Sequence, residues 1–213
     1  MAIKFYYGSG SPFSWFVWLT LEHKQIPHEF QLMSLQNGEL KKTDFLAINP
    51  HGKVPTLVDD DFVLWESSVI VEYLEERYPD NPLLPSTLRD KTIARRMVAE
   101  VHSYLYPALR RLLELTLFRP EVEGDPLEIK QSIYDLNHQL AYFEGLFQGE
   151  HFFETLTVVD FALYPLLALV KRLHEKQPQY RSEVIIWPKL LTFMQHIEQL
   201  PYFSKTTPPH WKG

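Results

Sequence analysis

The spacing of apolar residues divides this chain into two regions. Up to about residue 77, short apolar runs typical of strands alternate with segments in which apolar residues recur every three or four positions, as on a helix face. After about residue 88 the helical periodicity continues over long stretches, and strand-like runs nearly disappear. The pattern therefore predicts an α/β region followed by an all-α helical bundle.

The first region is predicted to have the order βαβ, a short helical segment, then ββα. Ser11 and Pro12 open its first helix, because serine is a good N-cap and proline suits the first helical position. Strands are expected over residues 3–7, 28–33, 54–58 and 62–64, and helices over residues 11–24 and 67–77, with a weak helical pattern over residues 36–48.

Prolines at positions 79, 82 and 85 mark a linker before the helical region. The predicted organisation is a first domain at residues 1–79, a linker at 80–88 and an all-helical domain at 89–213. Long helices are expected over residues 88–118, 126–147, 158–176 and 188–200, and the tail from Thr206 to Trp211 is expected to be extended.

Composition narrows the function classes. The 213 residues are 45% apolar, and no run approaches the roughly 18 apolar residues that a membrane span needs. The chain has no cysteine, which excludes disulfides and thiolate metal sites and disfavours a thiol–disulfide oxidoreductase. The formal charge of −6 argues against nucleic acid as a partner. With no signal-peptide pattern and only scattered histidines, we expect a cytoplasmic protein without a metal, cofactor or membrane partner.

The stretch from Asn49 to Leu57 carries the most specific local signal. The peptide bond before Pro55 can adopt the cis form at a cost of about 0.5–1 kcal/mol. A cis bond turns the Val54 N–H and C=O out of the sheet ladder, where a free peptide can pair with them as an added strand. Glu66 and Ser67 follow at a helix start, whose N–H groups favour a carboxylate, while Glu66 can meet an ammonium. These features suit a small zwitterionic peptide.

Four motifs in this order and spacing resemble the cytosolic glutathione S-transferases, and the likeness spans nearly the whole chain. The motifs are Asn49-Pro50, Gly52-Lys53-Val54-Pro55, Glu66-Ser67 and the helix cap Thr157-Val-Val-Asp160. The resemblance implies a thioredoxin-like first domain that binds glutathione, a helical second domain that helps to form an electrophile pocket, and a homodimer. Glutathione is then a co-substrate, and the expected activity is its conjugation to small apolar electrophiles in detoxification.

The resemblance also implies roles for individual residues. Val54 and Pro55 would hold the cysteinyl backbone of glutathione, and Glu66 and Ser67 its γ-glutamyl end. The glycyl carboxylate would face Lys53, with help from Lys41 or Lys42, and the electrophile pocket would include Tyr7, Phe13, Tyr104 and Arg111.

Ser11 falls where serine-type members place the hydroxyl that serves the thiol; Ser11-Pro12-Phe13 resembles the tau class of plants, and Ser14-Trp15 the zeta class. Lowering a thiol pKa from about 8.5 to about 6.5 takes about 2.7 kcal/mol. An N-cap serine accepts a backbone N–H but keeps its own proton to donate to a thiolate, beside the positive end of the helix dipole. Each contribution is about 1–2 kcal/mol, so no general base is required.

Other interpretations of the same residues stay open. Ser11 is also explained as a plain N-cap, and Tyr6 or Tyr7 is a rival, because other members use a tyrosine hydroxyl at the end of the first strand. Phe16 stands where many serine-type members carry an arginine, which gives weight to a non-catalytic glutathione-transferase-like binding or interaction protein. Peroxidase or isomerase activity of the same thiolate is a variant of the enzyme interpretation.

Overall fold

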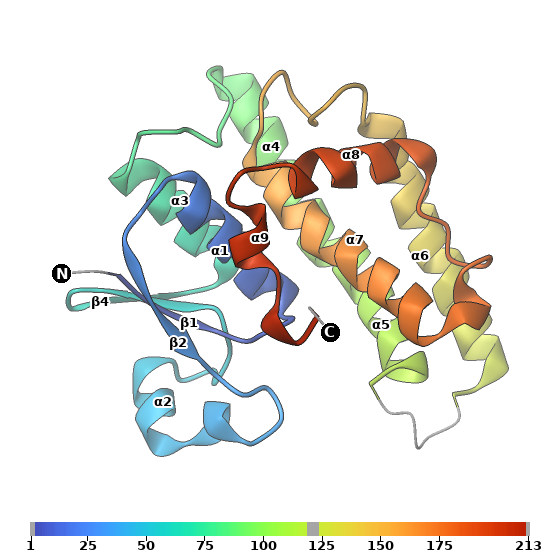
Figure 1. Ribbon diagram of the computed structural model, residues 1–213, viewed down its shortest axis with the longest axis horizontal. Coiled ribbons are helices and arrows are strands. Elements are labelled where there is room, and N and C mark those ends of the chain that lie inside the picture. The colour runs from blue at the N-terminus through green and yellow to red at the C-terminus, as the bar shows by residue number, and fades with distance from the viewer. Residues whose placement is uncertain (1–2, 119–123, 212–213) are drawn as a thin grey trace. The chain divides into compact units, whose positions relative to one another are not determined.

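The computed structural model describes residues 3–118 and 124–211, which form two compact units (Figure 1). The first unit contains the chain up to Leu84 together with the tail from Leu200 onward, and the second runs from Pro85 to Gln199. From the sequence the tail is expected in the helical domain, whereas it packs within the first unit.

The first unit has the predicted βαβ, helix, ββα order. β3 begins at Thr56 rather than at Val54, because Pro55 has no N–H to donate to the ladder. The elements are β1 (Ile3–Tyr7), α1 (Pro12–His23), β2 (His28–Leu32), a 3₁₀ turn (Glu39–Lys41), α2 (Thr43–Ile48), β3 (Thr56–Asp59), β4 (Phe62–Trp65) and α3 (Ser67–Arg77), followed in the tail by α9 (Phe203–Thr206) and a 3₁₀ turn (Pro209–Trp211).

The four strands form one mixed sheet in the order β2-β1-β3-β4. β1 and β2 are parallel, whereas β3 is antiparallel to both β1 and β4. Helices cover both faces in Figure 1. Tyr7 contacts Trp18 of α1 with ring centroids 5.2 Å apart, while Tyr6 turns to the other face and lies 5.7 Å from Phe45 of α2. This alternation fixes which tyrosine is buried against α1.

Parts of the tail are helical, which corrects the expectation of an extended segment from Thr206 to Trp211: Thr206 ends α9, and Pro209–Trp211 form a 3₁₀ turn. The side chain of Thr206 is fully buried, and its hydroxyl accepts a 3.0 Å hydrogen bond from the Trp15 indole and donates to the Phe203 carbonyl at 2.9 Å. A further bond of 2.7 Å joins His23 Nδ1 to the Tyr202 hydroxyl. These bonds hold the tail against α1 and give α9 a tertiary reason to form, which its four residues do not supply locally.

A buried ion pair fastens the segment after α3 to the first unit. Lys24 Nζ lies 2.7 Å from Glu75 Oε1, and both side chains are almost fully buried. Lys24 also donates to the Asp80 carbonyl at 3.0 Å, and Glu75 accepts the Leu83 N–H at 3.1 Å. These hydrogen bonds satisfy the remaining polar groups and help to offset the desolvation penalty of burying the two charges.

The second unit is helical. The predicted helix over residues 88–118 contains a π-helical turn ahead of Pro107, which cannot donate to the carbonyl four residues earlier. Its elements are α4 (Leu88–Glu100), the π-helical turn (Val101–Leu105), α5 (Tyr106–Thr116), α6 (Pro126–Leu146), α7 (Val158–Lys176), a 3₁₀ turn (Pro178–Tyr180) and α8 (Pro188–Glu198).

α7 is the central helix of this unit and is buried from Val158 to Val170. Its N-terminus is closed by Asp160, whose Oδ2 accepts both the Thr157 N–H and the Thr157 hydroxyl at 2.7 Å. Asp160 Oδ1 accepts the Phe152 N–H at 3.2 Å. The capping box expected from the sequence is therefore present, with aspartate in the place of the usual glutamate.

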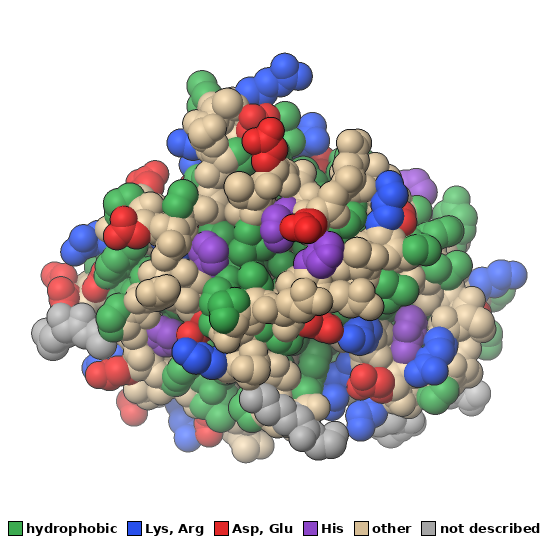
Figure 2. Space-filling model, turned by 45° about the horizontal axis from the view of Figure 1, so that its top comes forward, with side chains coloured by type: hydrophobic (Ala, Val, Ile, Leu, Met, Phe, Trp, Pro, Cys, Tyr) green, Lys and Arg blue, Asp and Glu red, His purple; other side chains and the backbone are tan. Residues whose placement is uncertain are grey.

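The surface carries charges of both signs. Lys and Arg side chains are interspersed with Asp and Glu over the face drawn in Figure 2. Of the helices in residues 3–118 and 124–211, none is both long and apolar enough to cross a bilayer. Within the same ranges, no three His, Cys, Asp or Glu side chains are grouped so that they could hold a metal ion.

Candidate functional site

The candidate site lies at one edge of the sheet. Strand register places Tyr6 beside Thr56 and Thr56 beside Trp65, while Tyr7 pairs with Leu32. The segments after β1, β2 and β4 therefore leave the sheet at the same end. The segment before β3 enters the sheet at that end. The sequence-predicted residues on these segments are Ser11, Val54, Pro55, Glu66 and Ser67.

Ser11 caps α1 and keeps its hydroxyl proton available. Its Oγ accepts the Ser14 N–H at 3.3 Å, and its own N–H donates to the Gly8 carbonyl at 3.0 Å. Among the residues that the structure describes, no acceptor takes the Ser11 hydroxyl proton. The side chain is half-buried at the positive end of α1, so it can donate to an anion bound there.

Ser14 holds the turn before Ser11 from the helix side. Its buried Oγ accepts the Gly8 N–H at 3.3 Å. Gly10 completes the turn with φ of +82°, a conformation that residues with a Cβ rarely adopt. The sequence showed Ser14 only as part of a class resemblance, yet its contacts make it a positioning residue for the cap.

The segment before β3 presents an unpaired peptide unit. The Val54–Pro55 bond is cis, as predicted, and among the described residues neither the Val54 N–H nor its C=O has a hydrogen-bond partner. Buried Asn49 shapes this loop, since its amide donates to the Lys53 carbonyl at 3.0 Å and to Thr56 Oγ1 at 2.9 Å. A segment held in this way can accept an extended peptide alongside it.

The Lys41 ammonium approaches the loop at Gly52, the residue before Lys53. Gly52 has φ of +57°, and a Cβ there would lie 2.5 Å from the Leu40 carbonyl oxygen, so no side chain fits. The same Cβ position is 3.3 Å from Lys41 Nζ, so the Lys41 ammonium lies over the loop that carries Lys53. Lys42 instead lines a separate cavity of about 290 Å³. Lys41 is therefore better placed than Lys42 to act with Lys53.

Glu66 has an unusual backbone conformation. Its φ of +68° and ψ of 110° lie outside the regions that non-glycine residues normally occupy, and such outliers concentrate at functional sites. It is the exposed N-cap of α3, and buried Ser67 is the first helical residue. The first-turn N–H groups have no acceptor within the helix. The start of α3 therefore presents both the Glu66 carboxylate and unpaired backbone N–H donors.

Tyr6 and Tyr7 lie on opposite faces of the sheet. Tyr7 is buried, and its ring stacks on Phe5 at 5.6 Å. Burial raises the pKa of the Tyr7 hydroxyl, which keeps the phenol protonated. Tyr6 is half-buried and faces α2.

The four residues expected in the electrophile pocket fall in separate units. Tyr7 and half-buried Phe13 belong to the first unit, where the nearby Phe16 is fully buried in α1. Tyr104 is in the π-helical turn of the second unit and is 61% exposed. Arg111, also in the second unit, lies 3.7 Å from a carboxylate oxygen of Glu128.

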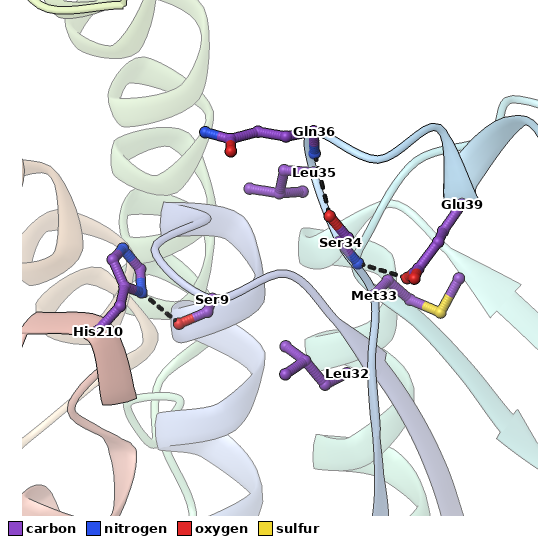
Figure 3. A pocket seen from close by; sticks show the side chains of 8 residues that line it. All are labelled: Ser9, Leu32, Met33, Ser34, Leu35, Gln36, Glu39 and His210. Carbon is purple, nitrogen blue, oxygen red and sulfur yellow. Dashed lines mark hydrogen bonds between the residues drawn. The ribbon is translucent and has the colours of Figure 1, made fainter.

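A pocket of about 490 Å³ lies within the first unit, and sequence reasoning missed it (Figure 3). Ser9 and His210 form one side, and the end of β2 with the segment after it forms the other. The segment carries no motif, and Ser9 and His210 are 201 positions apart, so no local signal indicates them. The lining residues are Ser9, Leu32, Met33, Ser34, Leu35, Gln36, Glu39 and His210.

Comparison with known proteins relates the sequence to one family. Residues 10–77 match the family model described as "Glutathione S-transferase, N-terminal domain". A zeta-class glutathione S-transferase of Euphorbia esula is 31% identical over 206 residues, which cover 97% of this chain and 90% of that protein. Maleylacetoacetate isomerase of Dictyostelium discoideum is 28% identical over 198 residues, which cover 92% and 88%.

Solved structures are also similar. A bacterial maleyl pyruvate isomerase, a glutathione S-transferase in the zeta class solved in its holo form, has a TM-score of 0.79 and 27% identity, with 96% of each chain covered. A glutathione transferase homologue from Lodderomyces elongisporus, solved with two GSH per subunit, has a TM-score of 0.84 and 22% identity, covering 97% of this chain and 98% of that one. The second match bears on the fold alone.

Proposed function

We propose that this chain, which belongs to the glutathione S-transferase family, is an enzyme that ionises the thiol of glutathione and directs the thiolate at small apolar electrophiles. The observation that carries the proposal is the Ser11 hydroxyl, whose oxygen accepts the Ser14 N–H while its proton stays uncommitted among the described residues. A donor at a helix N-terminus is suited to stabilising an anion.

Glutathione is proposed to bind along the edge of the sheet. Its cysteinyl backbone pairs with the unpaired N–H and C=O of Val54. The γ-glutamyl carboxylate meets the α3 N-terminus at Ser67, and the γ-glutamyl ammonium meets Glu66. The glycyl carboxylate lies against Lys41 and Lys53, whose charges attract it.

The thiol of a peptide bound in this way points toward the first turn of α1. Ser11 donates its hydroxyl proton to the sulfur, and the dipole of the 12-residue α1 favours the anion. Together these effects lower the thiol pKa by about as much as nucleophilic attack at neutral pH requires. The proton leaves to solvent, so no general base takes part.

One thiolate serves two reaction types. Attack on an electrophilic carbon forms a C–S bond, and conjugation results if that bond is kept. If the adduct rotates about the former double bond and then expels the sulfur, the double bond is isomerised and the thiolate is regenerated. The relatives named as isomerases favour this second outcome as a companion activity.

A non-catalytic glutathione-binding protein is the second candidate. Phe16 favours it, because this fully buried aromatic side chain supplies no positive charge where many serine-type members carry an arginine. The peptide-binding features at Val54 and Glu66 serve a binder equally well.

We also propose that the protein works as a homodimer in the cytoplasm, where thiols stay reduced. Both features follow from the family resemblance. They are tested by measuring the solution mass and by fractionating cells.

An ultraviolet difference titration with glutathione at neutral pH tests the proposal. We expect a saturable thiolate band with the native protein and no band with S-methylglutathione, which has no ionisable thiol. Ser11→Ala should keep glutathione binding and lose most of the band.

The outcomes separate the two candidates. Saturable binding without a thiolate band favours the binder. Absence of glutathione binding contradicts both. A band that survives Ser11→Ala leaves the enzyme standing but moves the role of Ser11 to Tyr6 or Tyr7.

A further inference from the structure

His210 reaches from the tail to the turn in front of Ser11. Its Nδ1 lies 2.7 Å from Ser9 Oγ, and its Nε2 accepts a 2.9 Å hydrogen bond from the Trp211 indole N–H. Figure 3 shows the imidazole and the Ser9 hydroxyl facing each other across the end of the pocket. The tail thus contributes a side chain directly to the turn that leads into α1.

The two contacts determine where the imidazole proton lies. An indole nitrogen is a donor only, so His210 Nε2 must accept with its lone pair, and the proton of the neutral ring is on Nδ1. Nδ1 therefore donates to Ser9 Oγ. With one lone pair occupied in this way, the Ser9 hydroxyl keeps its own proton to donate elsewhere.

The position of His210 is built by its surroundings. A Cβ at Gly10 would lie 3.0 Å from His210 Cε1 and 3.3 Å from Nε2, so the ring rests directly on a residue that has no side chain. Trp211 packs edge-on against Trp15 with ring centroids 5.4 Å apart, which anchors the tail next to the imidazole.

The pocket beside Ser9 is mainly apolar. Leu32 at the end of β2 and Leu35 in the segment after it project into the pocket in Figure 3. Ser34 is bonded within its own segment: its N–H donates to Glu39 Oε2 at 2.7 Å, and its Oγ accepts the N–H groups of Gln36 and Asn37. A volume of about 490 Å³ suits a small organic molecule, and a polar group held in place at the wall gives such a pocket specificity.

We propose that Ser9 donates a hydrogen bond to a carbonyl oxygen of the second substrate, and that His210 is the positioning residue that orients the Ser9 hydroxyl for this contact. The inference rests on the proposed function, since it needs a glutathione thiolate near Ser11. Among the electrophiles of the proposed function, the Ser9 contact therefore favours those whose reacting carbon is conjugated to a carbonyl group.

The thiolate sulfur forms a bond to the β-carbon, and the electron pair of the C=C π bond moves to give an enolate whose charge resides mainly on oxygen. Ser9 donates to that oxygen, and this contact strengthens as the charge develops. The α-carbon then takes a proton from water, and hydroxide is neutralised by the proton that the thiol released earlier.

Two electrophiles with the same aryl group test the inference. We compare 4-phenylbut-3-en-2-one, which has a carbonyl oxygen, with benzyl chloride, which has none. Ser9→Ala should lower kcat/KM about tenfold for the enone and less than about twofold for the chloride. His210→Leu should change the ratio in the same direction. His210→Asn should restore it, because the amide N–H can replace Nδ1–H. Exposed His138 in the second unit supplies the control His138→Leu.

Each outcome is decisive because the thiolate band reports folding and glutathione binding in every variant. Equal losses on both substrates, or an unchanged ratio in Ser9→Ala, overturn the inference and leave the proposed function standing. No band and no turnover in the native protein overturn the proposed function, and this inference with it. Failure of His210→Asn to restore the ratio removes His210 from the positioning role.

Discussion

The N-termini of α1 and α7 are both capped by a hydroxyl side chain, yet the two hydroxyl protons are used differently. At α7, Thr157 Oγ1 donates to Asp160 Oδ2 at 2.7 Å, and both residues are fully buried. At α1 the equivalent third position is Ser14, whose Oγ instead accepts the Gly8 N–H. The α7 cap is closed on itself, whereas Ser11 retains a proton for a ligand.

The residue at the third helical position makes the difference. At α4, Thr87 Oγ1 donates to Asp90 Oδ2 at 2.7 Å, so this exposed cap is closed in the same way as the buried one at α7. An aspartate at that position consumes the hydroxyl proton whether or not the cap is buried. A structural cap can therefore be distinguished from a ligand-facing cap by its partner rather than by the capping residue.

The largest effect is expected when the closed cap is broken. Asp160→Ala removes the acceptor of three hydrogen bonds, from the Thr157 N–H, the Thr157 hydroxyl and the Phe152 N–H. Leaving these donors unsatisfied should reduce the free energy of unfolding by about 3–5 kcal/mol. Urea unfolding followed by circular dichroism measures the loss.

The control for Asp160→Ala is Thr157→Ser, which keeps both donors to the carboxylate and should lose much less stability. A loss below about 1 kcal/mol in Asp160→Ala would show that water replaces the carboxylate, and the cap would not be closed as described.

Ser11→Ala removes the hydroxyl that caps α1 and should affect catalysis far more than stability. Loss of one donor to a developing or resident anion is expected to lower kcat about 100-fold. The accompanying loss of the N-cap bond should reduce the free energy of unfolding by only about 1 kcal/mol. Steady-state kinetics and urea unfolding of the same preparation measure both quantities.

Thr87→Ala is the matched control, because it removes a cap hydroxyl from α4 with a similar expected loss of stability. It should leave kcat within about twofold. If Thr87→Ala and Ser11→Ala reduce activity equally, the two caps do not differ in function and the distinction drawn from their partners is wrong.

Much of the fold could be predicted from the sequence, because the local signals agreed with the packing. α3 and α7 begin and end where the apolar periodicity indicates, at Ser67–Arg77 and Val158–Lys176. The start of β3 was misplaced, since the apolar run continues through Val54 while hydrogen-bond pairing begins at Thr56. Periodicity reports side-chain burial and not which peptide units enter the ladder.

The site was only partly predictable. The motif around Pro55 and the Ser-Pro start of α1 indicate the peptide-binding edge, because their chemistry is local. The tail contacts are not local: Trp15 and Thr206 are 191 positions apart, and Ser9 and His210 are 201 apart. Such pairs form only after the chain has folded, and a four-residue helix such as α9 has no propensity signal of its own.

The smallest expected effect is a pH dependence of the free energy of unfolding. It arises at His23 of α1, which is hydrogen-bonded to Tyr202 of the tail. Burial, with a smaller contribution from the charge of Lys24, lowers the pKa of His23 from 6.5 to about 4. The folded state therefore keeps His23 neutral, hydrogen-bonded to Tyr202, while the unfolded chain binds a proton below about pH 6.5. Its contribution to stability is complete above that pH and is lost as the pH falls towards 4.

The test compares the native protein with His23→Asn, which cannot titrate in this range. Between about pH 7.5 and pH 5, the native free energy of unfolding should fall by about 1 kcal/mol more than that of the variant, after allowance for partial solvent exposure. His102, whose pKa burial also lowers to about 4, is present in both proteins and cancels in the difference. Equal pH slopes would mean that the pKa of His23 is not lowered in the folded protein, and the predicted loss of stability at low pH would be wrong.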